Sequence, residues 1–158
     1  MACNRELIFS TLYTRLSNLS GVAYISRVFK TFDDLEASQQ PAIIMIKSTE
    51  ETINQRGYPT VWKLNGLLYL YVRNDADPHL GPSVLLNQML TSIESAFERQ
   101  PNETYVSNPS FANTPNDFMT NLNGLCSHAW ISGPIQTDEG TLGSQAVAVI
   151  PFEIMATS

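Results

Sequence analysis

Charged side chains are scarce in this sequence of 158 residues. Asp, Glu, Lys and Arg make up 15% of it, against about 25% in a typical soluble domain. The polar residues of the chain are instead mostly uncharged: Asn, Gln, Ser and Thr. Because Lys and Glu are depleted at the centres of protein interfaces, a surface of this composition suits contacts with other proteins.

Basic residues are fewer than acidic ones, with 9 Lys and Arg against 15 Asp and Glu, so the formal charge is −6. The basic residues are scattered and form no run. Binding to a phosphate backbone relies on clustered Lys and Arg. We therefore expect no specific nucleic-acid binding.

Cysteine and long apolar runs are also rare. The chain has Cys3 and Cys126, and its N-terminus lacks the basic leader and apolar block of a secretory signal, which predicts a reducing compartment and free thiols. The longest apolar run, GLLYLYV at 66–72, is far shorter than the roughly 20 residues that a membrane-spanning helix needs. No membrane association is expected.

The common catalytic signatures are missing: the P-loop, the GxSxG elbow, the HExxH zinc motif and the GxGxxG dinucleotide motif. Cys126 and His128 would share a strand face, but no Asn or Asp is indicated to orient them. The two Cys and two His of the chain fit no zinc module. We expect no enzyme activity and no cofactor.

The loop Asp75-Ala-Asp77-Pro-His79 looks most like a site. Two alternate carboxylates and a histidine could bind a metal ion or supply an acid–base pair. The loop links a predicted strand to a predicted helix, where Asp and Pro are common as turn and capping residues. The role as turn and capping residues is favoured, and a metal-dependent enzyme remains an alternative.

Apolar periodicity predicts the elements of the fold. Helices are predicted from residue 5 to a stop at Ser20-Gly21, and from Pro82 or Ser83 to before Pro101. Strands are predicted at 22–29, 42–47, 60–74, 125–135 and 144–155, with a polar connection at 48–59. This order indicates one α+β domain over 1–158, with a mostly antiparallel sheet of about five strands flanked by two main helices.

Three local features refine this prediction. Gly66 is the natural place for a bend in the long strand 60–74, which has one apolar face and one mixed, aromatic face. Pro151 lacks an amide donor, which places the last strand at a sheet edge or gives it a bulge. The segment 101–123 is rich in Asn, Pro, Ser and Thr and has no period, so it is predicted to be irregular.

Five segments follow the N-terminal helix in a distinctive order: QQPAIIMIKSTEET (39–52), WKLNGLLYLYV (62–72), LLNQMLTSIESAF (85–97), HAWISGPIQTDEG (128–140) and AVAVIPFEI (146–154). This pattern, from about Arg5 to Ile154, resembles the tail terminator, or tail completion, proteins of tailed double-stranded DNA bacteriophages. The resemblance lies in the order of elements, and no diagnostic motif accompanies it.

The resemblance implies a structural virion protein made in the host cytoplasm. Such proteins form a ring, usually hexameric, that caps the tail tube, ends its polymerisation and joins the tail to the head. The implied partners are other copies of this chain, the tail tube protein and the head connector or neck proteins. DNA would pass through the ring, and the acidic balance suits a channel to which DNA does not stick. The alternative within the same setting is another tail or neck component, such as a tube or connector subunit.

Several residues are candidates for these contacts. The loop from Thr49 to Tyr58 is predicted to project onto a neighbouring ring. The turn between the last two strands is predicted to face a neighbouring subunit or the channel, and two aromatic residues of 101–123 could touch a partner. The candidates are Glu50, Glu51, Arg56, Tyr58, Asp138, Glu139, Phe111 and Phe118.

Overall fold

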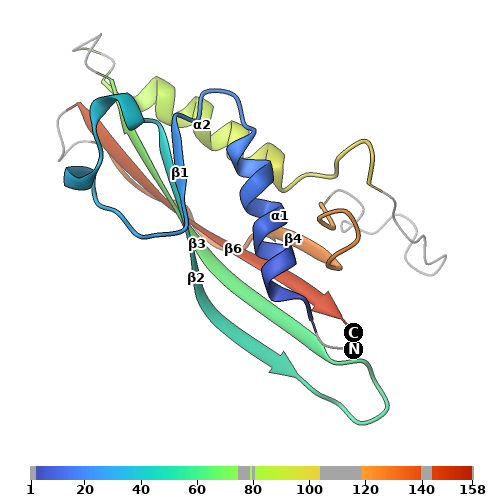
Figure 1. Ribbon diagram of the computed structural model, residues 1–158. Helices are drawn as coiled ribbons and strands as arrows, with labels where there is room; N and C mark the ends of the chain where they lie inside the picture. Colours follow the sequence, from blue (N-terminus) through green and yellow to red (C-terminus); the bar gives the residue numbers. More distant parts are fainter. Residues whose placement is uncertain (1–2, 75–78, 80, 104–118, 140–143, 158) are drawn as a thin grey trace.

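The fold is α+β, with helices on one side of a mostly antiparallel sheet (Figure 1). The computed structural model describes residues 3–74, 79, 81–103, 119–139 and 144–157. Its elements are α1 (Arg5–Ser17), β1 (Tyr24–Ser26), η1 (Phe32–Asp34), η2 (Ala37–Gln39), β2 (Ala42–Ile53), β3 (Val61–Arg73), α2 (Ser83–Ala96), β4 (His128–Ile131), β5 (Gln136–Asp138) and β6 (Gln145–Thr157). The predicted fold class is confirmed, with six strands where about five were expected.

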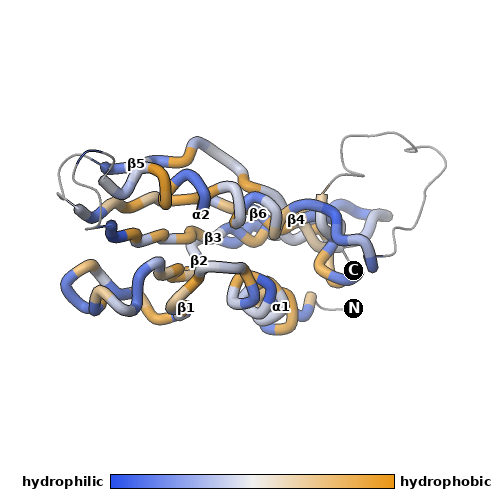
Figure 2. The backbone as a smooth tube through the Cα atoms, turned by 90° about the horizontal axis from the view of Figure 1, so that it is seen from above, coloured by the Kyte–Doolittle hydropathy of each residue, from blue (hydrophilic) through white to orange (hydrophobic). Residues whose placement is uncertain are grey.

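The strands run β1-β2-β3-β6-β4 across the sheet, and β5 also pairs with β6. Only β1 and β2 are parallel among the pairs described. Figure 2 shows β1, β2, β3, β6 and β5 in this order from one edge to the other. The pair β3–β6 runs from Val61↔Thr157 to Arg73↔Gln145 without interruption, so these two strands form the centre of the sheet.

One face of the sheet carries the main core. The predicted apolar face of β3 is buried, as are the alternate residues of β6 from Ala146 to Ala156. Both helices cover this face (Figure 1). They contribute the buried residues Ile8, Phe9, Leu12 and Leu16 from α1 and Leu86, Met89, Ile93 and Ala96 from α2.

The opposite face is partly covered by the chain itself. Leu35 is buried with Ala42, Ile44 and Tyr71 in a second, smaller cluster. The Tyr71 hydroxyl donates a hydrogen bond to the carbonyl of Lys30 at 2.7 Å. The segment between β1 and β2 therefore covers the aromatic end of the face that the sequence predicted to be mixed.

The strand predicted at 42–47 is longer than expected, because β2 continues to Ile53. The added residues are mostly polar and exposed, except that Glu50 is half-buried and Ile53 is apolar, and those from Glu50 onward are held by backbone pairing with β3. The pairing slips between Lys47 and Glu50, opposite Gly66. The predicted irregularity thus lies beside Gly66 in the partner strand, while β3 itself remains continuously paired with β6.

The C-terminal region corrects two predictions. The strand expected at 125–135 is limited to β4, and a separate short strand, β5, lies at Gln136–Asp138, where a turn was expected; the two pair one after the other along β6. Pro151 does not lie at an edge or in a bulge, because β6 is paired on both sides and its register with β3 is regular. Its carbonyl accepts a hydrogen bond from Ser132 N–H at 3.0 Å. The N and O atoms of a strand residue point to the same neighbour, so the missing donor faces the break between β4 and β5.

The strand predicted at 22–29 is also shorter than expected, because only Tyr24–Ser26 pairs with β2.

No helix within the described residues is long and apolar enough to cross a membrane.

Candidate functional site

The end of the β2–β3 hairpin forms an arm that projects from the body of the molecule (Figure 1). Its tip comprises residues 52–60. Its tip is ordered by local hydrogen bonds. Tyr58 N–H donates to the carbonyl of Gln55 at 3.0 Å, and Thr60 Oγ1 donates to Asn54 Oδ1 at 2.8 Å. Gly57 sits between them with a φ of +85°, a left-handed conformation that glycine adopts without strain. The tip is therefore shaped before any partner arrives.

The tip displays residues that favour protein contacts. Tyr58 is 69% exposed and Ile53 is 39% exposed, and Arg56 is exposed between them. No acidic residue occurs from Thr52 to Thr60. Tyr and Arg are enriched among the residues that dominate binding energy at interfaces. An arm with an aromatic and cationic tip is therefore suited to insert into an acidic or apolar surface.

Glu50 occupies the base of the arm and is engaged within the chain. Its carboxylate accepts hydrogen bonds from Arg5 Nε at 2.7 Å and Lys47 Nζ at 2.6 Å. Hydrogen bonding from Arg5 first, and then from Lys47, lowers the pKa of Glu50 to about 2. Glu50 thus braces β2 against α1, while its neighbour Glu51 is exposed and lies 3.9 Å from Lys63 Nζ.

Asp138 and Glu139 lie far from the tip. Asp138 is half-buried opposite Val147, which in turn pairs with Tyr71. Tyr71 is ten residues beyond Val61 along β3, a separation of roughly 33 Å at strand spacing. The structure does not bring Asp138 and Glu139 together with Arg56 and Tyr58. Phe111 and Phe118 lie outside the described residues.

The site-like loop of the sequence is only partly described. His79 is exposed in a turn, and Asp75 and Asp77 lie outside the described residues. Within the described chain, no three His, Cys, Asp or Glu residues are grouped so that they could hold a metal ion.

The neighbouring Cys126 and His128 do not have the properties of a nucleophile and its base. Burial, with a smaller contribution from Glu103, raises the pKa of the Cys126 thiol to about 12. Burial lowers the pKa of His128 to about 4, and its ring stacks on Trp130 with centroids 3.8 Å apart. A thiol that stays protonated is a poor nucleophile, so this pair serves packing.

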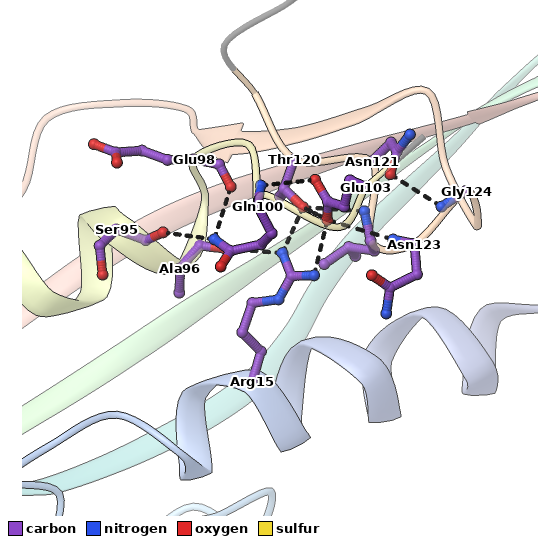
Figure 3. Close-up of polar contacts among 11 residues, drawn as sticks. Arg15, Ser95, Ala96, Glu98, Gln100, Glu103, Thr120, Asn121, Asn123 and Gly124 are labelled. Carbon is purple, nitrogen blue, oxygen red and sulfur yellow. Dashed lines mark hydrogen bonds and ion pairs between the residues drawn. The ribbon is translucent and has the colours of Figure 1, made fainter. Parts of the chain in front are cut away.

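A buried ion pair that the sequence did not reveal lies under a pocket between α1 and the end of α2. Arg15 reaches from α1 toward Glu103 and Thr120 (Figure 3). Its Nη2 lies 2.8 Å from Glu103 Oε1, and its Nη1 donates to the carbonyl of Ala96 at 3.3 Å. The Glu103 side chain is fully buried. Arg15 and Glu103 are 88 positions apart, so no local pattern announces their contact.

Backbone groups complete the environment of Glu103 (Figure 3). Gln100 N–H donates to Oε2 at 3.1 Å and Asn123 N–H to Oε1 at 3.4 Å. The Thr120 hydroxyl also donates to Oε1. The carboxylate therefore connects α1 with the turn after α2 and the turn before β4, and the last two are also joined by the β-bridge Glu98↔Met119.

The pocket above this ion pair has a volume of about 510 Å³. It is lined by Ser10, Thr11, Thr14, Arg15, Asn18, Leu19, Ser95, Ala96, Gln100 and Asn123. Arg15 is the only charged residue of this lining, and Glu103 neutralises it. The hydroxyls of Ser10 and Thr11 donate to the carbonyl of Leu7 in their own helix. The lining thus offers hydrogen-bonding groups and no activated nucleophile.

No protein-family model and no curated protein sequence matches this chain. Among solved structures, the chain is similar to a protein described as "Virion of native gene transfer agent (GTA) particle", with a TM-score of 0.49 and 7% sequence identity over 99% of this chain and 96% of that chain. A likeness at this level does not establish a shared function.

Proposed function

We propose that this protein is a structural component of a phage-like virion and acts as a tail terminator. In this role several copies form a ring, of six in the simplest case, that caps the tail tube, ends its growth and joins the tail to the head connector. The whole chain acts as one domain, and DNA passes through the ring without specific binding. The protein carries out no catalysis in this role.

The observation that carries the proposal is the ordered arm between β2 and β3. It exposes Tyr58 and Ile53 to 69% and 39% beyond the body of the fold. Large apolar side chains that are exposed to water at the end of a projecting hairpin are unusual in a protein that acts alone. Because the hairpin is already ordered, these side chains contribute binding affinity when a partner covers them. The order of the elements, which resembles that of tail terminators, supports the same function.

The proposal is tested by deleting the gene in the phage-like element that encodes it. We expect tails of abnormal length that do not join heads, as seen by negative-stain electron microscopy. Supplying the wild-type chain in trans should restore normal particles. Normal tails joined to heads in the deletion strain would refute the proposal.

The alternatives predict different outcomes of related experiments. A tube subunit would be found along the whole tail by immunogold labelling, whereas a terminator would be found at one level next to the head. A metal-dependent enzyme that uses Asp75, Asp77 and His79 would bind divalent metal in a calorimetric titration, and Asp77→Ala would abolish that binding.

A further inference from the structure

The end of the molecule opposite the arm carries exposed acidic side chains. Asp33, Asp34 and Glu36 are exposed in the two short turns that precede β2, at the upper left of Figure 1. No ion pair joins these three residues to a basic side chain of the described chain. The apolar neighbours Val28 and Phe29 are 70% and 51% exposed. We call residues 28–36 the acidic end; they hold three carboxylates and one cation, Lys30, which is half-buried with its Nζ over the Tyr24 ring.

The acidic end has a defined shape. The Asp34 carboxylate accepts hydrogen bonds from Thr31 N–H at 2.9 Å and from Thr31 Oγ1 at 3.0 Å. Leu35 is buried in the small cluster on the sheet, and Phe32 packs on Tyr71 with ring centroids 4.6 Å apart. The carboxylates of Asp33 and Glu36 are therefore held on a fixed platform, as the residues of the arm are.

The arm is complementary to this surface in charge and in chemistry. Its tip has Arg56 as the only charged residue from Thr52 to Thr60, and no ion pair joins Arg56 to the rest of the described chain. Tyr58 at the tip and Phe29 at the acidic end are both largely exposed. Arg and Tyr facing carboxylates and an aromatic ring form a pairing that gives both specificity and affinity.

The two surfaces cannot meet within one molecule. The arm and the acidic end lie at opposite ends of the long axis of the fold (Figure 1). A contact between them must join one copy to another copy. Such a contact is heterologous, because each copy uses a different patch on each side, and its repetition closes a ring when the rotation allows it.

We propose that the arm of one copy, through Arg56 and Tyr58, docks on the acidic end of a second copy, against Asp33, Glu36 and Phe29. This proposal deepens the proposed function, because it names the contact between neighbouring subunits. It is nevertheless testable on the purified full-length protein, without any tail or head.

Charge reversal provides the test. The oligomeric state is measured by sedimentation velocity and native mass spectrometry for the wild type, for Arg56→Glu, for the double variant Asp33→Lys/Glu36→Lys, and for the combination of all three changes. Each reversal alone should weaken association at least about tenfold, a change typical of close charge pairs across an interface. The combined variant should regain most of the wild-type affinity, because attraction is restored with the signs exchanged.

A matched control separates this effect from a general change of net charge. Glu94 is exposed on α2, an element that belongs to neither surface, so Glu94→Lys should leave association unchanged. Circular dichroism and thermal unfolding should be the same for all variants, because every substituted residue is exposed.

Three outcomes would overturn the proposal: a wild type that remains monomeric up to millimolar concentration, reversals that leave association unchanged, or a combined variant that does not recover. None of them refutes the function in tails, which the deletion experiment tests separately. Conversely, recovery in the combined variant would support this contact even if the tails proved normal without the protein.

Discussion

At the scale of single residues, Gly66 shows how closely the sheet and its core are fitted. A Cβ at this position would lie 2.3 Å from Phe152 Cζ and 2.7 Å from the carbonyl oxygen of Ile46. Phe152 is fully buried and pairs directly with Gly66 across the strands. The ring therefore occupies the space that a side chain would need, and the backbone oxygen cannot move aside cheaply.

We expect Gly66→Ala to lower the free energy of unfolding by at least about 2 kcal/mol, because overpacking in a closed core forces side chains and backbone to shift. Urea denaturation followed by circular dichroism measures the change. Gly133→Ala is the matched control, since a Cβ there would meet only Pro151 Cγ at 3.2 Å. A Gly66 variant as stable as the Gly133 variant would contradict this packing.

His128 is a second residue whose role depends on its surroundings. Burial lowers its pKa from the ordinary 6.5 to about 4, and its Nε2 has no hydrogen-bond partner among the residues that the structure describes. The unfolded chain therefore binds a proton near pH 6.5, whereas the folded chain does not until about pH 4. The stability that neutral His128 contributes is complete above pH 6.5 and is lost as the pH falls toward 4.

We expect the wild type to lose up to roughly 3 kcal/mol between pH 7 and pH 4 from this residue, at about 1.4 kcal/mol per pH unit. His128→Phe should flatten that part of the profile, as measured by urea denaturation at a series of pH values. His79→Asn is the control, because His79 is exposed in a turn. Equal slopes for the wild type and His128→Phe between pH 6.5 and 5 would refute this assignment.

At the scale of elements, the Arg15–Glu103 pair joins α1 to the turn after α2. Its atoms are 2.8 Å apart and the carboxylate is fully buried. Breaking such a pair leaves one buried charge uncompensated, whereas replacing both partners with apolar residues removes the charge altogether.

We expect Arg15→Met to cost about 3–5 kcal/mol of unfolding free energy. The double variant Arg15→Met/Glu103→Met should cost clearly less than the sum of the two single variants, because no unpaired charge remains. A double-mutant cycle by chemical denaturation measures this coupling. Strict additivity of the two changes would show that the residues do not interact in solution.

At the scale of the whole molecule, the arm is separable from the fold that carries it. Ile53 and Val61 are paired neighbours at the end of the ladder, so a two-residue Asn-Gly turn can join them in place of residues 54–60. None of residues 54–60 belongs to either buried cluster. The fold should therefore survive without the tip.

We expect the chain with this shortened arm to retain its circular dichroism spectrum and to unfold within a few degrees of the wild type, since surface changes are usually worth about 0.5 kcal/mol or less. In the deletion strain it should fail to restore tails joined to heads. Full restoration by the shortened chain would show that the arm is not the contact on which assembly depends.

The sequence predicted those parts of the fold that have a local cause. Alternation along β3 places Trp62, Leu64 and Leu68 on one face because side chains of a strand alternate whatever their neighbours are. The stripe Leu86, Met89 and Ile93 on α2 is likewise set by the helical repeat. The extension of β2 to Ile53 was not predicted, because polar residues such as Glu50 and Glu51 are held there by pairing with β3 and carry no apolar pattern.

Some of the candidate contact residues could likewise be predicted from the sequence, and the surroundings of others could not. Arg56 and Tyr58 were found in the sequence because a polar connection with Gly57 and Pro59 indicates a turn, and turns lie at the surface. That Glu50 is bound to Arg5 and Lys47, and so braces the arm, could not be predicted, because Arg5 is 45 positions away. The place of the acidic end opposite the arm could not be predicted either, because it depends on how the strands are arranged in the sheet.

By itself, then, the sequence determined the spacing of apolar residues along each main helix and strand, the net charge of −6 and the absence of catalytic motifs. These properties depend only on the residues and their immediate neighbours in the chain. Tertiary structure alone decided that Pro151 faces a break between two strands, that Phe152 fills the space over Gly66, and that Glu103 accepts Arg15. These contacts join residues far apart in the chain, and only the folded sheet determines which of them meet.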